Sequence, residues 1–287
     1  MENSKEEKQT VDCQSAEPTG QEKRPEVNVK LIVKTALITL MLVVFAFGYF
    51  VVTISAVAPK TMANTFASLG FNKTSYLVYK RVYAREKTNE NLYNVIQLSI
   101  SRKNYKDMEY YIDLMLSGDN FNKFSAKVDE ETKKVIGEEY NSYINSYANY
   151  LASQYTIALY NNGKILEAKM IAIDSLDPNS SASAFYAYTD CVMNDKNILE
   201  SQKTREFRTL KNKYGCISEL NARLAELDAD DTSTLSKVEK IEILEQKIRL
   251  NEIMYRIGKY TEDEVMAETS ESAITNCINE INTLRNN

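Results

Sequence analysis

The chain contains no histidine and no tryptophan among its 287 residues. Without histidine, it cannot form a Ser-His-Asp triad, a Cys-His dyad or an imidazole metal site. The four cysteines, Cys13, Cys191, Cys216 and Cys277, form no CxxC pair, which argues against a zinc knuckle or a thioredoxin-like site. These absences favour a protein that binds over one that catalyses. We expect no enzymatic activity, no cofactor and no metal.

Glycine, proline and excess positive charge are also scarce. The chain has only eight glycines and four prolines, and its net charge is −5. A chain with this net negative charge lacks the positive electrostatic potential that attracts nucleic acid, so we expect no nucleic-acid partner. No run alternates apolar and polar residues between hairpin turns, whereas apolar residues recur at helical spacing almost throughout. The sequence therefore predicts an all-α protein.

One long hydrophobic run is present, from Thr35 to Ala58, without a charged residue. A bilayer-spanning helix needs about 20 apolar residues, more than a soluble core usually supplies in one run. A cleaved signal peptide would explain the small-x-small pattern Ala56-Val57-Ala58. However, the polar region before the run is long, and the run exceeds the usual ~7–15 residues. We predict an uncleaved transmembrane helix over 31–58, with the membrane contact through 35–58.

Basic residues near the two ends of this run indicate its orientation. Positive charge is denser on the N-terminal side of the run than on its C-terminal side. The N-terminal side has Lys23, Arg24, Lys30 and Lys34, and the C-terminal side has Lys60 and Lys73. Cytoplasmic flanks carry the excess of Lys and Arg. We expect a disordered cytoplasmic tail over 1–30 and an extracytoplasmic C-terminal domain. The opposite orientation, with the domain in the cytoplasm, is the alternative.

The C-terminal region reads as a series of helical hairpins. Apolar periodicity and turn residues predict helices over 91–102, 105–117, 138–161, 164–176, 181–193, 199–227, 235–257 and 261–284. Short turns imply antiparallel neighbours. We divide the region into first hairpins over 59–127, central hairpins over 128–195, and a C-terminal hairpin with a last helix over 196–287.

Three stretches resemble the tetratricopeptide repeat. In the stretch Ala158–Ser180, Gly163 stands at the turn, Glu167-Ala168 opens the second helix and Asp177-Pro178-Asn179 ends the unit. Each of these features matches its place in that repeat. The small residues let antiparallel helices approach, and each hairpin needs a neighbour to cover its remaining apolar face.

Lys103–Ser117 resembles the same turn and second helix, with Asn104-Tyr105 at the turn and Met108 where alanine is usual. Arg256–Val265 resembles them again through Gly258-Lys259-Tyr260. The resemblance implies a tetratricopeptide-like array of antiparallel helical hairpins that binds a partner in a groove between helices. A generic helical bundle is the alternative.

Tyrosine is the abundant aromatic residue and supplies the candidate binding positions. Tyr140, Tyr143, Tyr147 and Tyr150 follow a 3-4-3 spacing, which would place them on one face of the expected helix 138–161. A tyrosine combines apolar area with a hydrogen-bonding tip, as a binding face needs. The other interpretation is a helix seam whose hydroxyls reach the edge of the core. Tyr110 and Tyr111 allow the same two interpretations.

The last helices carry heptad-like apolar positions, which indicate coiled-coil packing. One set is Ile217, Leu220, Leu224 and Leu227, and the other is Ile241, Leu244, Ile248 and Tyr255. Because the heptads are few, we expect these helices to pack within the chain, with pairing to another chain as the alternative.

Together these features predict a membrane-anchored, extracytoplasmic helical-repeat protein that acts as an interaction scaffold or assembly factor. Its expected partner is a protein or peptide. A sensor or regulatory subunit that binds a small ligand or an envelope component is the alternative. In an extracytoplasmic domain Cys191 and Cys216 could be bridged, but we favour the interpretation that the cysteines of the domain are isolated small apolar side chains.

Overall fold

The computed structural model describes residues 29–137, 140, 145–176, 181–229 and 232–286. The chain divides into two compact units, Met1–Val57 and Ala58–Asn287. Among the described residues every regular element is a helix, which confirms the predicted all-α class.

The described part of the first unit is one helix, α1 (Val29–Val57). At ~1.5 Å per residue its 29 residues rise about 43 Å, more than the ~30 Å hydrocarbon core of a bilayer. The described apolar side chains between Val33 and Phe50, among them Met41 and Phe45, are exposed. Within the described part of the chain, this is the one helix long and apolar enough to cross a membrane.

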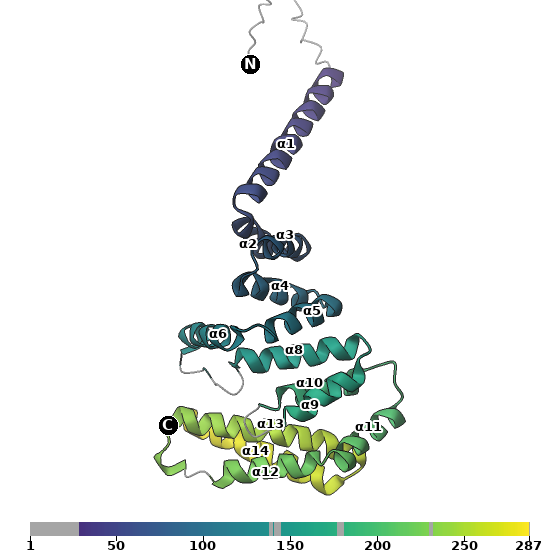
Figure 1. The fold of residues 1–287 in the computed structure, drawn as a ribbon, viewed down its shortest axis with the longest axis vertical. Helices are drawn as coiled ribbons and strands as arrows, with labels where there is room; N and C mark the ends of the chain where they lie inside the picture. Colours follow the sequence, from purple (N-terminus) through teal and green to yellow (C-terminus); the bar gives the residue numbers. More distant parts are fainter. Residues whose placement is uncertain (1–28, 138–139, 141–144, 177–180, 230–231, 287) are drawn as a thin grey trace, which may run out of the picture. The chain divides into compact units, whose positions relative to one another are not determined.

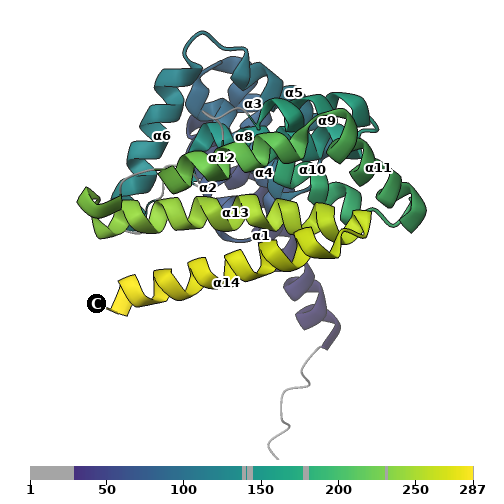
Figure 2. The same cartoon turned by 90° about the horizontal axis from the view of Figure 1, so that it is seen from below.

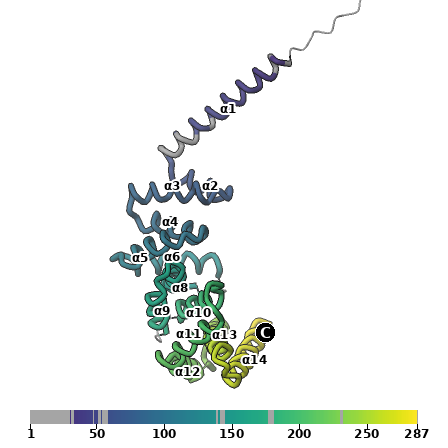
Figure 3. The backbone as a smooth tube through the Cα atoms, turned by 90° about the vertical axis from the view of Figure 1, so that its right-hand side faces the viewer, coloured from purple at the N-terminus to yellow at the C-terminus, as the bar shows by residue number. Residues whose placement is uncertain are grey.

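The second unit is an array of helices. In chain order they are α2 (Pro59–Ser68), α3 (Asn72–Arg85), α4 (Asn89–Ser101), α5 (Tyr105–Leu116), α6 (Phe121–Ile136), α8 (Tyr147–Asn161), α9 (Ile165–Asp174), α10 (Ser183–Asn194), α11 (Glu200–Lys213), α12 (Cys216–Ala229), a short 3-10 helix η2 (Thr232–Thr234), α13 (Lys237–Thr261) and α14 (Glu264–Asn286). Sequence neighbours pack on one another from α2 to α5 and from α8 to α10, and α5 packs directly on α8 (Figures 1 and 3). This packing of adjacent helices is repeat-like.

Four hairpin turns share one backbone geometry. The residue that reverses the chain has a positive φ in each, at Gly70, Lys103, Gly163 and Glu262. In each turn the next residue donates its backbone N–H five residues back, as Lys164 does to the Leu159 carbonyl at 2.9 Å and Asp263 does to Gly258 at 2.9 Å. This is the Schellman ending of a helix. The four hairpins are therefore built alike.

The same four hairpins also share a buried position in the second helix, five residues after the turn. It is occupied by Ser75, Met108, Ala168 and Ala267, all almost fully buried. The turn at Gly70 precedes the turn at Lys103 by 33 residues, close to the ~34-residue period of tetratricopeptide arrays. This first hairpin lies within the predicted hairpin region 59–127, but no helix was predicted before residue 91.

Two apolar cores run through the array and meet at α8. The first, between α2 and α8, includes Ile96, Ile112 and Leu151, and the second, between α8 and α14, is centred on Phe185 and Phe207. Tyr155 of α8 packs against both cores. Because one helix serves both cores, α8 is the element that joins the N-terminal hairpins to the C-terminal ones.

Two predicted helix boundaries were wrong because a local break was missed. The expected helix 138–161 begins only at Tyr147, and Tyr140 lies outside it. The expected helix 199–227 is two helices, since Gly215 adopts φ +65° between α11 and α12. α6 was not predicted at all, although its basic last turn, with Lys133 and Lys134, suits a helix C-terminus.

The expected turn at Gly258 was also wrong. α13 continues through Gly258 and ends at Thr261, and the chain reverses at Glu262. α14 returns along α13 for much of its length, as the view from below shows (Figure 2). As expected, α12 packs on α13 within the chain. Its Leu220 belongs to the second core, together with Leu250 and Ile253 of the C-terminal half of α13.

Candidate functional site

A groove of about 850 Å³ runs along α8 and α10. α8 contributes side chains about one turn apart, Tyr150, Ser153, Ile157 and Tyr160, and α10 contributes Ser183, Tyr186, Asp190 and Asn194 in the same way. Residues three and four apart share one helix face, so each wall is a single stripe of its helix. The loop 195–197 closes one end, and Arg249 of α13 reaches in from the C-terminal hairpin.

The groove is rich in tyrosine and asparagine. Its amide side chains are Asn149, Asn161, Asn194 and Asn197, and its tyrosines are Tyr150, Tyr160 and Tyr186. An asparagine offers both donors and an acceptor, and a tyrosine presents an apolar ring with a polar tip. The lining can therefore form hydrogen bonds to neutral polar groups and also cover apolar ones.

The α10 wall is braced from behind by α13. Arg256 donates a hydrogen bond of 2.7 Å to Asp190, and its guanidinium lies 3.9 Å from the centre of the Tyr186 ring. Arg249 lies 4.9 Å from the same ring centre. Arginine over an aromatic face is an attractive arrangement, and the ion pair neutralises Asp190. Tyr186 and Asp190 are thus held in place before any ligand binds.

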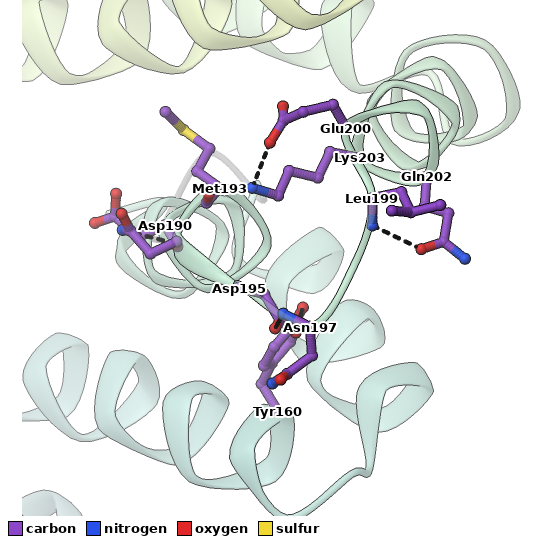
Figure 4. A network of polar contacts seen from close by, with 10 residues as sticks. Tyr160, Asp190, Met193, Asp195, Asn197, Leu199, Glu200, Gln202 and Lys203 are labelled. Atoms are coloured by element: carbon purple, nitrogen blue, oxygen red, sulfur yellow. Dashed lines mark hydrogen bonds and ion pairs between the residues drawn. The ribbon is translucent and has the colours of Figure 1, made fainter.

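The end wall of the groove is fixed by Asp195. It accepts hydrogen bonds from the Tyr160 hydroxyl at 3.0 Å and from the Asn197 backbone N–H at 2.8 Å. The hydrogen bond from the Asn197 backbone N–H is the main reason that the pKa of Asp195 lies below its usual range. Figure 4 shows Tyr160 rising from α8 toward this loop. The contact ties α8 to the loop that follows α10.

Lys203 of α11 secures the same end of α10. Its buried ammonium group donates to the Met193 carbonyl and to Glu200, both at 2.8 Å (Figure 4). The Met193 carbonyl belongs to the last turn of α10, where helix carbonyls lack partners within the helix. The contact with Glu200 is the main reason that the pKa of Lys203 is raised. The groove therefore lies on a rigid support.

The groove contains no activated nucleophile. Cys191 of α10 lines it, and burial raises the pKa of this thiol to about 12, with Asp190 and Asp195 adding to the effect. A neutral thiol is neither a nucleophile nor a metal ligand. Within the described ranges, no three Cys, Asp or Glu side chains gather in a way that would hold a metal ion.

The six tyrosines proposed from the sequence lie in several environments. Tyr150 is half-buried and lines the groove. Tyr147 is almost fully buried in the first core, beside Phe124 and Tyr93. Tyr143 lies outside the described residues. Tyr140 faces a separate depression between α6 and α13.

The remaining pair sits on α5. Tyr111 packs into the first core, while Tyr110 is 61% exposed and lines a shallow depression with Tyr155 and Lys164. Of the five of these tyrosines that the structure describes, only Tyr150 therefore lines the groove. Sequence reasoning missed Tyr160 and Tyr186. The run from Ser183 to Asn194 does show one-turn spacing, but spacing alone does not distinguish a groove wall from a core face.

The cysteines of the domain are unbridged. Cys191, Cys216 and Cys277 are all free thiols. Cys216 is fully buried at the start of α12, within the second core. The structure therefore agrees with the interpretation of these cysteines as isolated small apolar side chains, and not with a bridge between Cys191 and Cys216.

The sequence matches no protein-family model, and comparison with curated proteins and with solved structures returned no match.

Proposed function

We propose that this chain is a single-pass membrane protein whose helical domain binds a protein or peptide as a scaffold or assembly factor. The observation that carries the proposal is the groove between α8 and α10. It is open, braced on both sides, and lined by tyrosine and asparagine side chains. An elongated partner would lie along the two helices.

The chemistry of the groove favours a peptide-like ligand. Peptide groups carry one donor and one acceptor, which the amide oxygens and the second amide hydrogens of Asn161 and Asn194 can match, since each amide uses one hydrogen on a backbone carbonyl. Asp190 is already paired with Arg256, and Asp195 accepts a hydrogen bond from Tyr160. Selection would therefore rest on shape and hydrogen bonds, with the three tyrosines supplying apolar contact area and with Lys196 and Arg249 supplying positive charge.

The finer assignment to a tetratricopeptide-like array is part of this proposal. It is supported by the four alike turns, the buried residue five positions after each, and the 33-residue interval between Gly70 and Lys103. In such arrays each hairpin covers its neighbour, which leaves grooves between helices as the binding surface. α8 and α10 would then be equivalent first helices of adjacent hairpins.

Blocking the groove should abolish partner capture without unfolding the domain. Ser153 lies on the groove wall of α8, and Ser153→Arg would fill the space without removing a core side chain. A photo-crosslinker at Asn194 reports occupancy in cells. We expect Ser153→Arg to lower its crosslinking to a protein partner at least about tenfold, a loss of ~1.4 kcal/mol in binding.

Ser218→Arg is the matched control, because Ser218 is exposed on α12 and does not line the groove. It should leave crosslinking unchanged, and both variants should keep the helical circular dichroism and melting temperature of the parent. Equal crosslinking in the two variants would show that the partner binds elsewhere.

A sensor that binds a small ligand is the second candidate, because a volume near 850 Å³ lies within the ~300–1,000 Å³ range of ligand pockets. A compound that raises the melting temperature of the parent, but not of Ser153→Arg, would favour the sensor. A protein crosslinked at Asn194 in the absence of such a compound favours the scaffold.

The orientation in the membrane is a separate prediction. We propose that the domain is extracytoplasmic, because Lys30 and Lys34 lie just before the apolar stretch of α1. A C-terminal epitope should then be digested by protease added to cells whose outer barriers are permeabilised and whose cytoplasmic membrane is intact. Protection until that membrane is lysed would place the domain in the cytoplasm.

A further inference from the structure

The segment that follows the apolar helix has a charge balance opposite to that of the whole chain. The sequence holds no aspartate or glutamate from Pro59 to Arg85, although the chain as a whole has a net charge of −5. Its basic residues are Lys60, Lys73, Lys80, Arg81 and Arg85. The hairpin of α2 and α3 is therefore a cationic element at the start of an acidic protein.

Two of these cations have acidic partners. Lys60 pairs with Glu86 at 3.2 Å, and Lys80 pairs with Asp107 at 3.4 Å. The side chains of Lys73, Arg81 and Arg85 are exposed and make no ion pair or hydrogen bond with any residue that the structure describes. The unpaired charges are thus available to an external anion.

Large apolar side chains lie exposed on the same hairpin. Leu69 is 64% exposed and Phe71 58% exposed at the turn between the helices, and Leu77 is 51% exposed on α3. Phe66 of α2 contacts the edge of Phe71, with ring centres 6.3 Å apart. Exposed clusters of this kind mark contact sites for membranes or other macromolecules.

The charged and apolar groups share one side of α3. At 100° per residue, Leu77 falls between Lys73 and Arg81, and the arc of exposed positions ends at Arg85. The opposite side carries Tyr76 and Tyr79, which are buried in the first core, and Val82, which is also buried. One side of α3 therefore holds the hairpin in the domain and leaves the other side free.

Chain length keeps this surface close to the end of α1. α2 has 10 residues and rises about 15 Å, and only Ala58 separates it from Val57. If α1 spans a bilayer, the turn at Leu69 cannot lie far from its headgroup region. A bilayer surface is the one partner that must be present within this reach.

We propose that the exposed face of the α2–α3 hairpin docks on the bilayer interface, with Leu69, Phe71 and Leu77 entering it and Lys73, Arg81 and Arg85 contacting anionic lipid headgroups. Basic and apolar side chains on one face are the composition of interfacial membrane helices. The docking would hold the first hairpin against the membrane. This inference rests on the membrane anchor of the proposed function.

The absence of tryptophan allows a direct test. Phe71→Trp gives the full chain its only tryptophan, and brominated acyl chains quench a tryptophan that enters the bilayer. The protein is reconstituted in nanodiscs of phosphatidylcholine with 30% phosphatidylglycerol. We expect bromolipid quenching of Phe71→Trp at least about threefold stronger than that of Val265→Trp, whose position is 76% exposed on α14.

Two further variants separate the possible failures. Phe45→Trp, in the apolar stretch of α1, should be quenched whether or not the hairpin docks. If Phe45→Trp is not quenched, the membrane anchor itself is wrong. If Phe45→Trp is quenched and Phe71→Trp matches Val265→Trp, the docking proposal is overturned while the anchor stands.

The charge contribution has its own control. Replacing Lys73, Arg81 and Arg85 by Gln in the Phe71→Trp protein should lower its quenching at least about twofold in the anionic nanodiscs. The same replacement should change little in nanodiscs of phosphatidylcholine alone. Unchanged quenching in the anionic nanodiscs would contradict a role for anionic lipid.

Discussion

Gly258→Ala should destabilise the C-terminal hairpin by about 2 kcal/mol, roughly a 30-fold shift of the unfolding equilibrium. A Cβ at this position would lie 2.9 Å from the Ala267 backbone nitrogen and 3.1 Å from the Asp263 carbonyl oxygen. Both atoms belong to the backbone of the turn into α14, and the Ala267 N–H donates a hydrogen bond of 3.1 Å to the Asp263 carbonyl. Neither can move without opening the start of that helix.

The expected change in the free energy of unfolding is opposite in sign to the change for Gly→Ala at an exposed helix position. There, replacement by alanine stabilises by about 1 kcal/mol because it lowers the entropy of the unfolded chain and improves helix propensity. The stated loss is the net effect after this gain. Urea unfolding of the full chain in detergent, followed by circular dichroism, measures it. Hydrogen exchange should place the faster exchange in α13 and α14.

Lys259→Ala is the control for this experiment. Lys259 is the next residue of α13 and is exposed, so its replacement should leave stability within about 0.5 kcal/mol of the parent. If Gly258→Ala proves as stable as Lys259→Ala, α13 and α14 do not approach as closely as described.

The thiol of Cys191 should react with iodoacetamide at least about tenfold more slowly at pH 8 than an ordinary thiol. The thiolate is the reactive form, and an ordinary cysteine has a pKa near ~8.5. Burial first, and then Asp190 and Asp195, raise the pKa of Cys191 to about 12. The raised pKa lowers the thiolate fraction at pH 8, and reactivity falls with it.

Asn194→Cys provides a matched thiol on the same helix, three residues further on and exposed at the groove. Peptide mass spectrometry of the alkylated Cys13→Ser protein would compare the two sites. We expect rapid alkylation at position 194 and almost none at 191, and equal rates after unfolding in guanidinium. Rapid alkylation of native Cys191, or a disulfide between it and Cys216, would contradict the neutral buried thiol.

The fold class and many helices could be predicted from the sequence because they depend on local pattern. The expected helix 105–117 matches α5 (Tyr105–Leu116), and 91–102 matches α4 (Asn89–Ser101) within two residues. Hydrophobic periodicity and turn residues act within a few positions along the chain. The apolar stretch 35–58 was also predicted from local sequence, because its length and its apolar composition alone indicate a helix that could cross a bilayer.

The candidate site could not be predicted in this way. Tyr147 and Tyr150 share the same spacing, yet Tyr147 is buried in the first core and Tyr150 faces the groove. The difference depends on which helices cover each residue, and α4 and α6 reach Tyr147 from earlier in the chain. Arg256 braces Asp190 across 66 residues of sequence. Periodicity carries no information about such contacts.

The two glycines quoted for the repeat resemblance separate the local from the tertiary determinants. Gly163 does form the turn that its neighbours predict, with φ +81°, because a left-handed residue is a local requirement of the helix ending. Gly258 has the same side chain but lies inside α13, where the approach of α14 excludes a Cβ. The sequence by itself determined the all-α class, those helices whose ends are set by local turn residues, and the long apolar stretch of α1. Only the tertiary structure decided which faces meet, since that depends on the packing of distant helices.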